Sequence, residues 1–183
     1  QTIVSRSMDI TQNPSVVTVG KFTGGVRFNI IPEQAELVGT IRALHPDDRK
    51  KIHDLVRRTA TNIAEAMGAT VEVQVPATTA YPVTFNNVAL TNAMLPTLQA
   101  VAGADKVQLI KPQTGAEDFS FFADKVPGLY ISLGGRAKDK TADQVADHHT
   151  PDFFIDDSGL GLGVKAMTAM TLNYMRTNPR PTP

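Results

Sequence analysis

The amino-acid sequence predicts an α/β fold in two lobes, and three observations support this prediction. Residues 16–22 are rich in β-branched side chains, and residues 35–43 alternate apolar with polar ones, which is typical of strands. Residues 46–68 have the apolar periodicity of a helix, with proline in the first turn and glycine at the end. Beyond residue 87 the pattern changes to further helices and buried strands.

The first lobe is expected to span residues 1–80. Residues 1–6 resemble the end of a helix, and residues 71–75 alternate valine with polar residues, which predicts a third strand. The order helix, strand, strand, helix, strand matches a ferredoxin-like β-α-β-β-α-β unit without its first strand and most of its first helix. We therefore expect a truncated ferredoxin-like lobe. Its long helix is predicted to bury one apolar stripe, formed by Ile52, Leu55, Val56, Ile63 and Met67.

The second lobe is expected to span residues 81–183, after a linker over residues 76–87. Its predicted elements are helices over 86–101, 117–123 and 156–175 and short strands over 107–110 and 128–133. Pro96 is expected to bend the first of these helices. The last helix has apolar residues on most faces, so we expect it to be largely buried. Prolines after residue 175 predict a disordered tail.

Composition narrows the functional classes. The 183 residues carry 18 basic and 18 acidic side chains, and this net charge of zero argues against a nucleic acid or an anionic membrane as partner. Because cysteine is absent, thiolate zinc sites, disulfides and a cysteine nucleophile are excluded. No apolar run reaches membrane-spanning length, so we expect a soluble protein. The compartment stays open between cytoplasm, periplasm and the exterior.

A histidine pair lies before a Thr-Pro turn. Pro151 drives Thr150 toward an extended conformation, so His148 and His149 are expected in a loop that a metal or substrate can reach. Adjacent side chains rarely face the same site, so at most one of the two is expected to bind a metal. The alternative is a pair of solvent-exposed loop histidines.

Two further places could bind a carboxylate or line a site. Asn29 lies in a turn that leads into the strand carrying Arg42, and an amide together with a guanidinium can hold a carboxylate. The segment Gly115–Phe119 places Glu117 and its acidic neighbour at a predicted helix start. The alternatives are a turn asparagine, a surface arginine and an acidic first turn that complements the helix dipole.

These motifs, in their order along the chain, resemble the C-terminal half of the M20-family metallohydrolases. The most similar branch is that of N-acyl amino acid amidohydrolases, which includes hippurate hydrolases and auxin-conjugate hydrolases. The motifs that carry the resemblance are Val17-Thr18-Val19-Gly20, Gly24-Gly25, Asn29-Ile30-Ile31-Pro32-Glu33-Gln34-Ala35, Gly39-Thr40-Ile41-Arg42, Gly115-Ala116-Glu117-Asp118-Phe119 and His149-Thr150-Pro151.

The resemblance implies roles for both lobes. Residues 1–80 would be a lid and dimerisation domain, and residues 81–183 the C-terminal part of an α/β zinc-hydrolase catalytic domain. The parent enzyme would hold two divalent metal ions, zinc or alternatively manganese or cobalt. His149 would be a metal ligand, Asn29 and Arg42 would bind the substrate carboxylate, and Glu117 would line the site.

The resemblance also implies what this chain lacks. The family's other metal ligands, its glutamate base and its lid histidine lie upstream of the position that matches Gln1, so we expect no catalytic residue here. The parent is expected to be a homodimeric amidohydrolase of small N-acyl amino acids, and this chain alone to be inactive. The alternative is a non-enzymatic dimerisation or binding fragment. The sequence leaves open the acyl group, the amino acid, the metal, and whether the shortening is natural, proteolytic or engineered.

Overall fold

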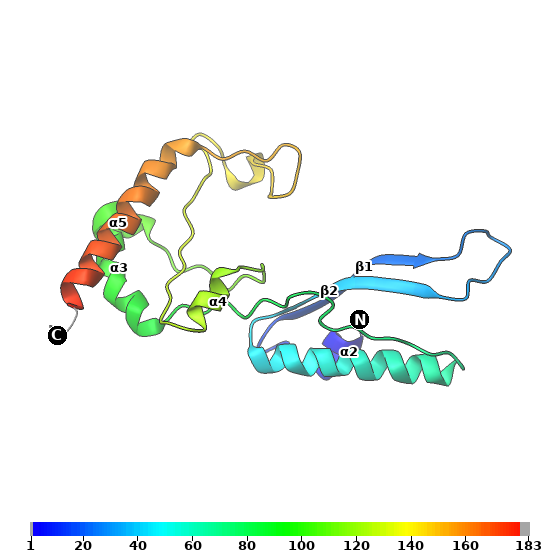
Figure 1. Cartoon of the computed structure of the whole chain (residues 1–183). Helices are drawn as coiled ribbons and strands as arrows, with labels where there is room; N and C mark the ends of the chain where they lie inside the picture. Colours follow the sequence, from blue (N-terminus) through cyan, green and yellow to red (C-terminus); the bar gives the residue numbers. More distant parts are fainter. Residues whose placement is uncertain (1, 180–183) are drawn as a thin grey trace. The chain divides into compact units, whose positions relative to one another are not determined.

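The computed structural model describes residues 2–179 (Figure 1). The chain divides into two compact units. The first contains the residues up to Thr84 and the segment Lys111–Asp124, and the second contains Phe85–Ile110 and the residues from Lys125 onward. The chain therefore leaves the first unit and returns to it. A functional division into lid and catalytic parts near residue 80 stays a prediction.

The first unit is built on an antiparallel hairpin. Strands β1 (Ser15–Gly24) and β2 (Ala35–Ala43) are paired from Ser15 opposite Ala43 to Gly24 opposite Ala35. Both strands lie where they are predicted, β1 from its β-branched residues and β2 from its alternation of apolar and polar residues. They form a two-stranded sheet, so the α/β class is confirmed at this level.

A β-bulge keeps the apolar residues of the hairpin on one face. The register shifts between Val19 and Lys21, which leaves Gly20 as the extra residue. Val19 lies opposite Gly39 and Phe22 lies opposite Leu37. Because successive side chains of a strand point to opposite faces, residues three apart would normally lie on different faces. The bulge therefore brings Phe22 onto the same face as Val19.

Helix α2 (Pro46–Ala66) follows the hairpin, and the short helix α1 (Thr2–Ser7) precedes it. His45 is the N-cap of α2, and its Nδ1 accepts a hydrogen bond from the backbone N–H of Asp47 at 3.3 Å. Ile52 and Leu55 are buried as predicted. The rest of the predicted stripe differs. Val56 is half-buried, while Ile63 and Met67 are 60% and 81% exposed. Periodicity identifies the apolar face of a helix, but not how far another element covers it.

The third strand predicted for residues 71–75 is not formed. These residues have no regular secondary structure, and within the described chain no strand pairs with them. The guanidinium of Arg57 donates a hydrogen bond to the carbonyl of Val75, so an arginine takes the place of a ladder partner there. Alternation favours extended backbone, whereas a strand also needs a neighbour in register. The ferredoxin-like arrangement is therefore not confirmed.

The second unit packs two helices together. Helix α3 (Val88–Ala102) contacts α5 (Leu160–Thr177), and Asn173 Nδ2 donates to Thr97 Oγ1 at 3.0 Å between them. Asn87 caps α3 by accepting from the N–H of Leu90 at 2.9 Å. The helix runs continuously through Pro96. Short 3₁₀ turns complete this unit: η1 (Ala104–Lys106), η2 (Ala142–Gln144) and η3 (Asp157–Gly159).

Three predictions for the second lobe are wrong. Residues 107–110 and 128–133 form no strands. Instead, the Asn86 side-chain amide donates to the Tyr130 carbonyl at 2.8 Å and accepts from the Tyr130 N–H at 2.7 Å, which satisfies the backbone of Tyr130 without a strand.

Helix α5 is also largely exposed, and within it only Ala166 and Met170 are buried. The helix extends through residue 177, and the end of the predicted tail, residues 180–183, lies outside the described residues.

Candidate functional site

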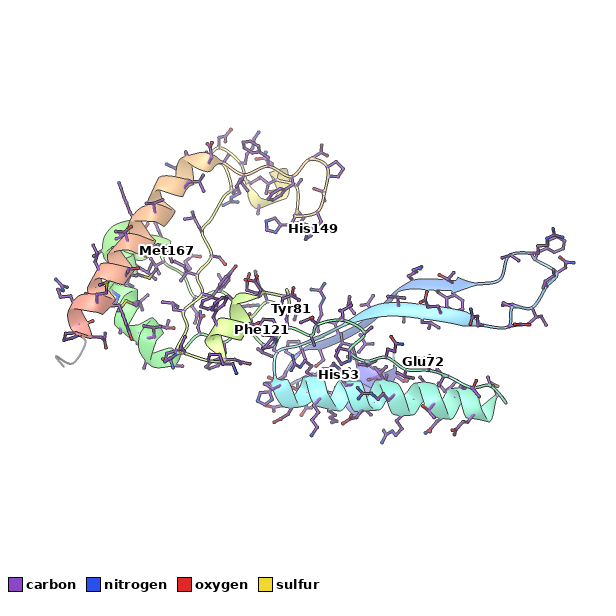
Figure 2. All side chains as sticks on the ribbon, viewed as in Figure 1. His53, Glu72, Tyr81, Phe121, His149 and Met167 are labelled. Atoms are coloured by element: carbon purple, nitrogen blue, oxygen red, sulfur yellow. The ribbon has the colours of Figure 1, made fainter. Side chains whose placement is uncertain are left out.

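His149 has an unusual backbone conformation. Its φ is +66°, and it is the one non-glycine residue with positive φ in the described chain. Such a conformation is sterically unfavourable for a residue with a side chain, and residues of this kind concentrate at functional sites. Figure 2 shows His149 on the loop between η2 and η3, and the residue is exposed.

The surrounding turn is held by local hydrogen bonds. Thr150 Oγ1 donates to the carbonyl of Asp147 at 2.7 Å, and the N–H of Phe153 donates to the carbonyl of Thr150 at 3.2 Å. The ring of His148 packs against the ring of Phe153 at a centroid distance of 4.7 Å and an interplanar angle of 64°. The two histidines therefore have different surroundings, since one ring is packed on an aromatic neighbour and the other projects from the turn.

The described residues do not complete a metal site. Within residues 2–179, no group of three or more histidine, aspartate or glutamate side chains lies close enough to hold a metal ion. Stable binding of a zinc ion requires several fixed ligands. His149 could contribute one ligand, but the residues present here do not fit a metal centre on their own.

Arg42 lies near the end of β2 and contacts another part of the first unit. Its Nη1 donates to the carbonyl of Thr114 at 2.9 Å. Asn29 lies in the loop that joins β1 to β2, beyond the pair of Gly24 with Ala35. Arg42 pairs with Val16 near the opposite end of the hairpin. The seven residue steps along β2 from Ala35 to Arg42 span roughly 23 Å at about 3.3 Å per residue. The structure therefore does not bring Asn29 and Arg42 together within one chain.

Glu117 lies just before α4 (Phe119–Ala123), in the same unit as Arg42. It is half-buried, and its Oε1 accepts a hydrogen bond from the N–H of Phe119 at 3.2 Å. Its own carbonyl accepts from Ser120 Oγ at 2.6 Å, and Ser120 is completely buried. Glu117 thus lies before the helix and interacts with its first residues, and its role in lining a site stays a prediction.

Sequence reasoning missed two contacts beside this segment. Arg49 Nη1 donates a hydrogen bond to the carbonyl of Tyr81 at 2.6 Å. The ring centroids of Tyr81 and Phe121 are 5.7 Å apart (Figure 2). Both contacts join residues more than 30 positions apart, and the local sequence pattern carries no signal for such pairs.

The described helices include none that is both long and apolar enough to cross a membrane.

The sequence of this chain is similar to that of a known enzyme family. The sequence pattern of Peptidase family M20/M25/M40 matches residues 7–173. The chain belongs to this family. It is 34% identical over 172 residues to thermostable carboxypeptidase 2 of Saccharolobus solfataricus, a match that covers 94% of this chain and 42% of the relative.

Two other relatives are named as a hydrolase and a deacetylase. The IAA-amino acid hydrolase ILR1-like 4 of Arabidopsis thaliana is 30% identical over 180 residues, covering 96% of this chain and 40% of the relative. The N-acetyldiaminopimelate deacetylase of Streptococcus thermophilus is 37% identical over 134 residues, covering 73% and 35%. This M20 chain therefore spans about two-fifths of the length of the curated relatives it matches.

Solved structures support the same fold. A protein assigned as an aminohydrolase from methicillin-resistant Staphylococcus aureus superimposes with a TM-score of 0.75 at 25% identity, covering 95% of this chain and 43% of that protein. The YXEP protein of Bacillus subtilis, described as a dinuclear metal binding peptidase from the M20 family, superimposes with a TM-score of 0.64 at 24% identity, covering 89% and 42%.

Proposed function

We propose that this chain is part of an M20 hydrolase that cleaves an amide bond next to a free carboxylate. The observation that carries the proposal is the family match over residues 7–173, whose relatives include a carboxypeptidase, a hydrolase of amino acid conjugates and an N-acetyl amino acid deacetylase. The substrates that these names denote share one group, a carboxylate beside the scissile amide. N-acyl amino acids are therefore the proposed substrate class. Relatives with hydrolase names do not favour the alternative of a non-enzymatic fragment.

His149 is the proposed contribution of this chain to the metal centre. Its strained backbone in a turn held by hydrogen bonds is consistent with a side chain held in one direction. Two divalent ions, zinc or alternatively manganese or cobalt, would supply Lewis acidity and an activated water in the parent enzyme. Since the described residues form no metal centre by themselves, we assign no chemical step to this chain.

Arg42 is the proposed anchor for the substrate carboxylate. A guanidinium presents five N–H donors in a planar fork that matches a carboxylate, and it stays charged at every physiological pH. Arg42 uses Nη1 for the Thr114 carbonyl, and its side chain is exposed. The Nε and Nη2 groups can therefore donate hydrogen bonds to a carboxylate while the bond from Nη1 to Thr114 is kept.

A homodimer would give Asn29 a role in the same recognition. Within one chain the hairpin separates Asn29 from Arg42 by most of its length. In a symmetric dimer the hairpin loop of one chain can reach the Arg42 end of the other, so that each carboxylate site takes Asn29 from one copy and Arg42 from its partner. Mixing the impaired Asn29→Ala and Arg42→Ala proteins would then recover part of the activity, because every mixed dimer carries one intact site. No recovery after confirmed subunit exchange would contradict this arrangement.

The substrate class is tested by the protein that contains this chain. N-benzoylglycine and its C-terminal amide should be compared at equal concentration, with release of benzoate measured by chromatography. Hydrolysis of the acid, with at least about tenfold slower hydrolysis of the amide, is the expected result, since a lost charge-assisted pair costs about 1.5–3 kcal/mol. Equal rates on both compounds, or cleavage of neither across a panel of N-acyl amino acids, would contradict the proposal.

A further inference from the structure

The contact between Arg42 and Thr114 joins two parts of the proposed site. Arg42 is the proposed carboxylate anchor on β2, and Thr114 lies three residues before Glu117. The donor and acceptor atoms are 2.9 Å apart, the length of a normal N–H···O hydrogen bond. Thr114 is half-buried, and its partner is its backbone carbonyl, so the bond fixes the path of the main chain rather than one side chain.

A second contact holds the far end of the same segment. The ring of Phe121 lies 5.7 Å from that of Tyr81, whose carbonyl accepts a hydrogen bond from Arg49 at 2.6 Å. The segment from Thr114 to Phe121, called here the Glu117 segment, is therefore held at its start by Arg42 and at its end through Tyr81. Between these points, buried Ser120 and the hydrogen bonds that Glu117 accepts order the first turn of α4.

We propose that Arg42 is a positioning residue for the Glu117 segment as well as a carboxylate anchor. The inference rests on the proposed function for the anchor, whereas the bond to Thr114 is made by residues of this chain alone. One rigid guanidinium would then contact the substrate carboxylate on one edge and the main chain before Glu117 on the other. Correct placement of the carboxylate and correct placement of Glu117 are thereby coupled through a single planar group.

Lysine cannot replace arginine in this role. Its ammonium is a point donor at the end of a flexible stem, so it can neutralise a carboxylate but cannot hold two partners on two edges of one plane. The Arg42→Lys variant therefore separates charge from positioning. If Arg42 serves only as a positive charge, the lysine variant keeps the order of the Glu117 segment.

Amide hydrogen exchange in the substrate-free protein measures this order directly. The amides of Phe119, Ser120 and Phe121 donate to acceptors within the Glu117 segment and so report its local opening. In the protein that contains this chain, Arg42→Ala and Arg42→Lys should both raise the exchange rates of these amides by about three- to tenfold, the effect of losing one ordinary hydrogen bond.

Two controls make the result decisive. Lys21→Ala removes an exposed cation from the same hairpin, where it pairs with Glu36 at 3.6 Å, and should leave these amides unchanged. The amides of α3, in the other unit, should be unchanged in every variant, which distinguishes local opening from global unfolding. Exchange at Phe119 to Phe121 that is the same in wild type, both Arg42 variants and Lys21→Ala would overturn the positioning role.

Kinetics separate this inference from the function on which it rests. With N-benzoylglycine, Arg42→Lys should lower kcat as well as raise KM, since both the anchor and the Glu117 segment are disturbed. A change in KM alone, with unchanged exchange, would overturn the positioning role while the proposed substrate class stands. Increased exchange without any preference of the wild type for the acid over its amide would support positioning and contradict the proposed substrate.

Discussion

The ring of His148 meets the ring of Phe153 edge to face, with centroids 4.7 Å apart. The next residue, His149, takes the positive φ of +66° that the turn requires. The packed ring and the strained backbone are neighbours in sequence but have different physical tasks. The ring of His148 packs on a neighbour within the turn, and His149 is exposed on the same turn.

The first prediction concerns this pair. In the protein that contains this chain, His149→Ala should lose bound metal and nearly all hydrolase activity, because it removes a proposed ligand. His148→Ala should reduce activity only mildly, since it weakens an aromatic contact worth about 0.5–1.5 kcal/mol. Metal content by mass spectrometry and activity measured on the same samples test this difference. Equal losses in the two variants would show that the assignment of the ligand is wrong.

A second prediction follows from close approach in the hairpin. A Cβ added at Gly39 would overlap the Thr18 carbonyl oxygen, which is backbone and cannot move aside alone. Gly39→Ala should therefore lower the free energy of unfolding by about 1–3 kcal/mol or more. Gly20→Ala is the matched control, because a Cβ there meets nothing within 4 Å. Urea denaturation should show a lower midpoint for the first variant only, and similar midpoints would argue against this packing.

The fold could be predicted from sequence where the relevant interactions are local. β-branched residues predicted β1, alternation predicted β2, and proline, glycine and apolar periodicity predicted α2. The strands expected at 71–75 and 128–133 failed for one reason. Each has a suitable pattern, but a strand also needs a partner segment, and in the described chain the side chains of Arg57 and Asn86 instead bond the backbone of Val75 and of Tyr130.

The third prediction tests the carboxylate anchor. In the protein that contains this chain, Arg42→Ala should reduce kcat/KM for an N-acyl amino acid by roughly ten- to a hundredfold, the cost of a charge-assisted pair. The same substitution should have a much smaller effect on the matching amide, which lacks the negative charge. Steady-state kinetics on both compounds provide the measurement. An identical loss on acid and amide would mean that Arg42 does not recognise the carboxylate.

The fourth prediction concerns pH. Burial lowers the pKa of His53 below its ordinary value of about 6.5. The charges of Arg49 and Arg57 lower it further, and Asp54 opposes them. At pH values near and below about 6.5 the unfolded chain therefore binds more protons at His53 than the folded chain does. The free energy of unfolding is highest above about pH 6.5 for this reason, and it decreases as the pH falls toward the lower pKa of the folded state.

The His53→Gln variant should lack this pH dependence. Urea midpoints measured between about pH 5 and 7.5 should fall more steeply with acidification in the wild type than in the variant. Above about pH 7 the urea midpoints of wild type and variant should change in parallel with pH, because His53 is neutral in both the folded and the unfolded state. Parallel curves across the whole range would show that His53 titrates alike in the folded and unfolded chains.

The fifth prediction is that this chain by itself does not catalyse amide hydrolysis. Within its described residues no three metal-binding side chains converge, and a lone imidazole binds zinc weakly because ordering its loop opposes binding. The purified 183-residue chain should be assayed with zinc, manganese and cobalt on N-benzoylglycine. Turnover at a normal enzymatic rate, with the chain length verified by mass spectrometry, would refute the prediction.

The candidate site was less accessible to sequence reasoning than the fold. Motifs in order along the chain were enough to predict the family, which the match over residues 7–173 confirms. They could not predict the positive φ of His149, a conformation that pattern usually assigns to glycine or asparagine. They also could not predict that Arg42 bonds to Thr114, because 72 positions separate these residues and no local rule links them. The proposed roles of Asn29, Glu117 and His149 stay predictions.

The bulge at Gly20 has a consequence for how this hairpin can change its length. Val19 and Lys21 lie opposite the consecutive residues Gly39 and Val38, so Gly20 has no cross-strand partner of its own. Deleting it would leave every existing pair in place, whereas lengthening or shortening β2 by one residue would move side chains to the opposite face. Gly20 is therefore the position at which the strand can lose one residue while the hairpin keeps its assignment of apolar and polar faces.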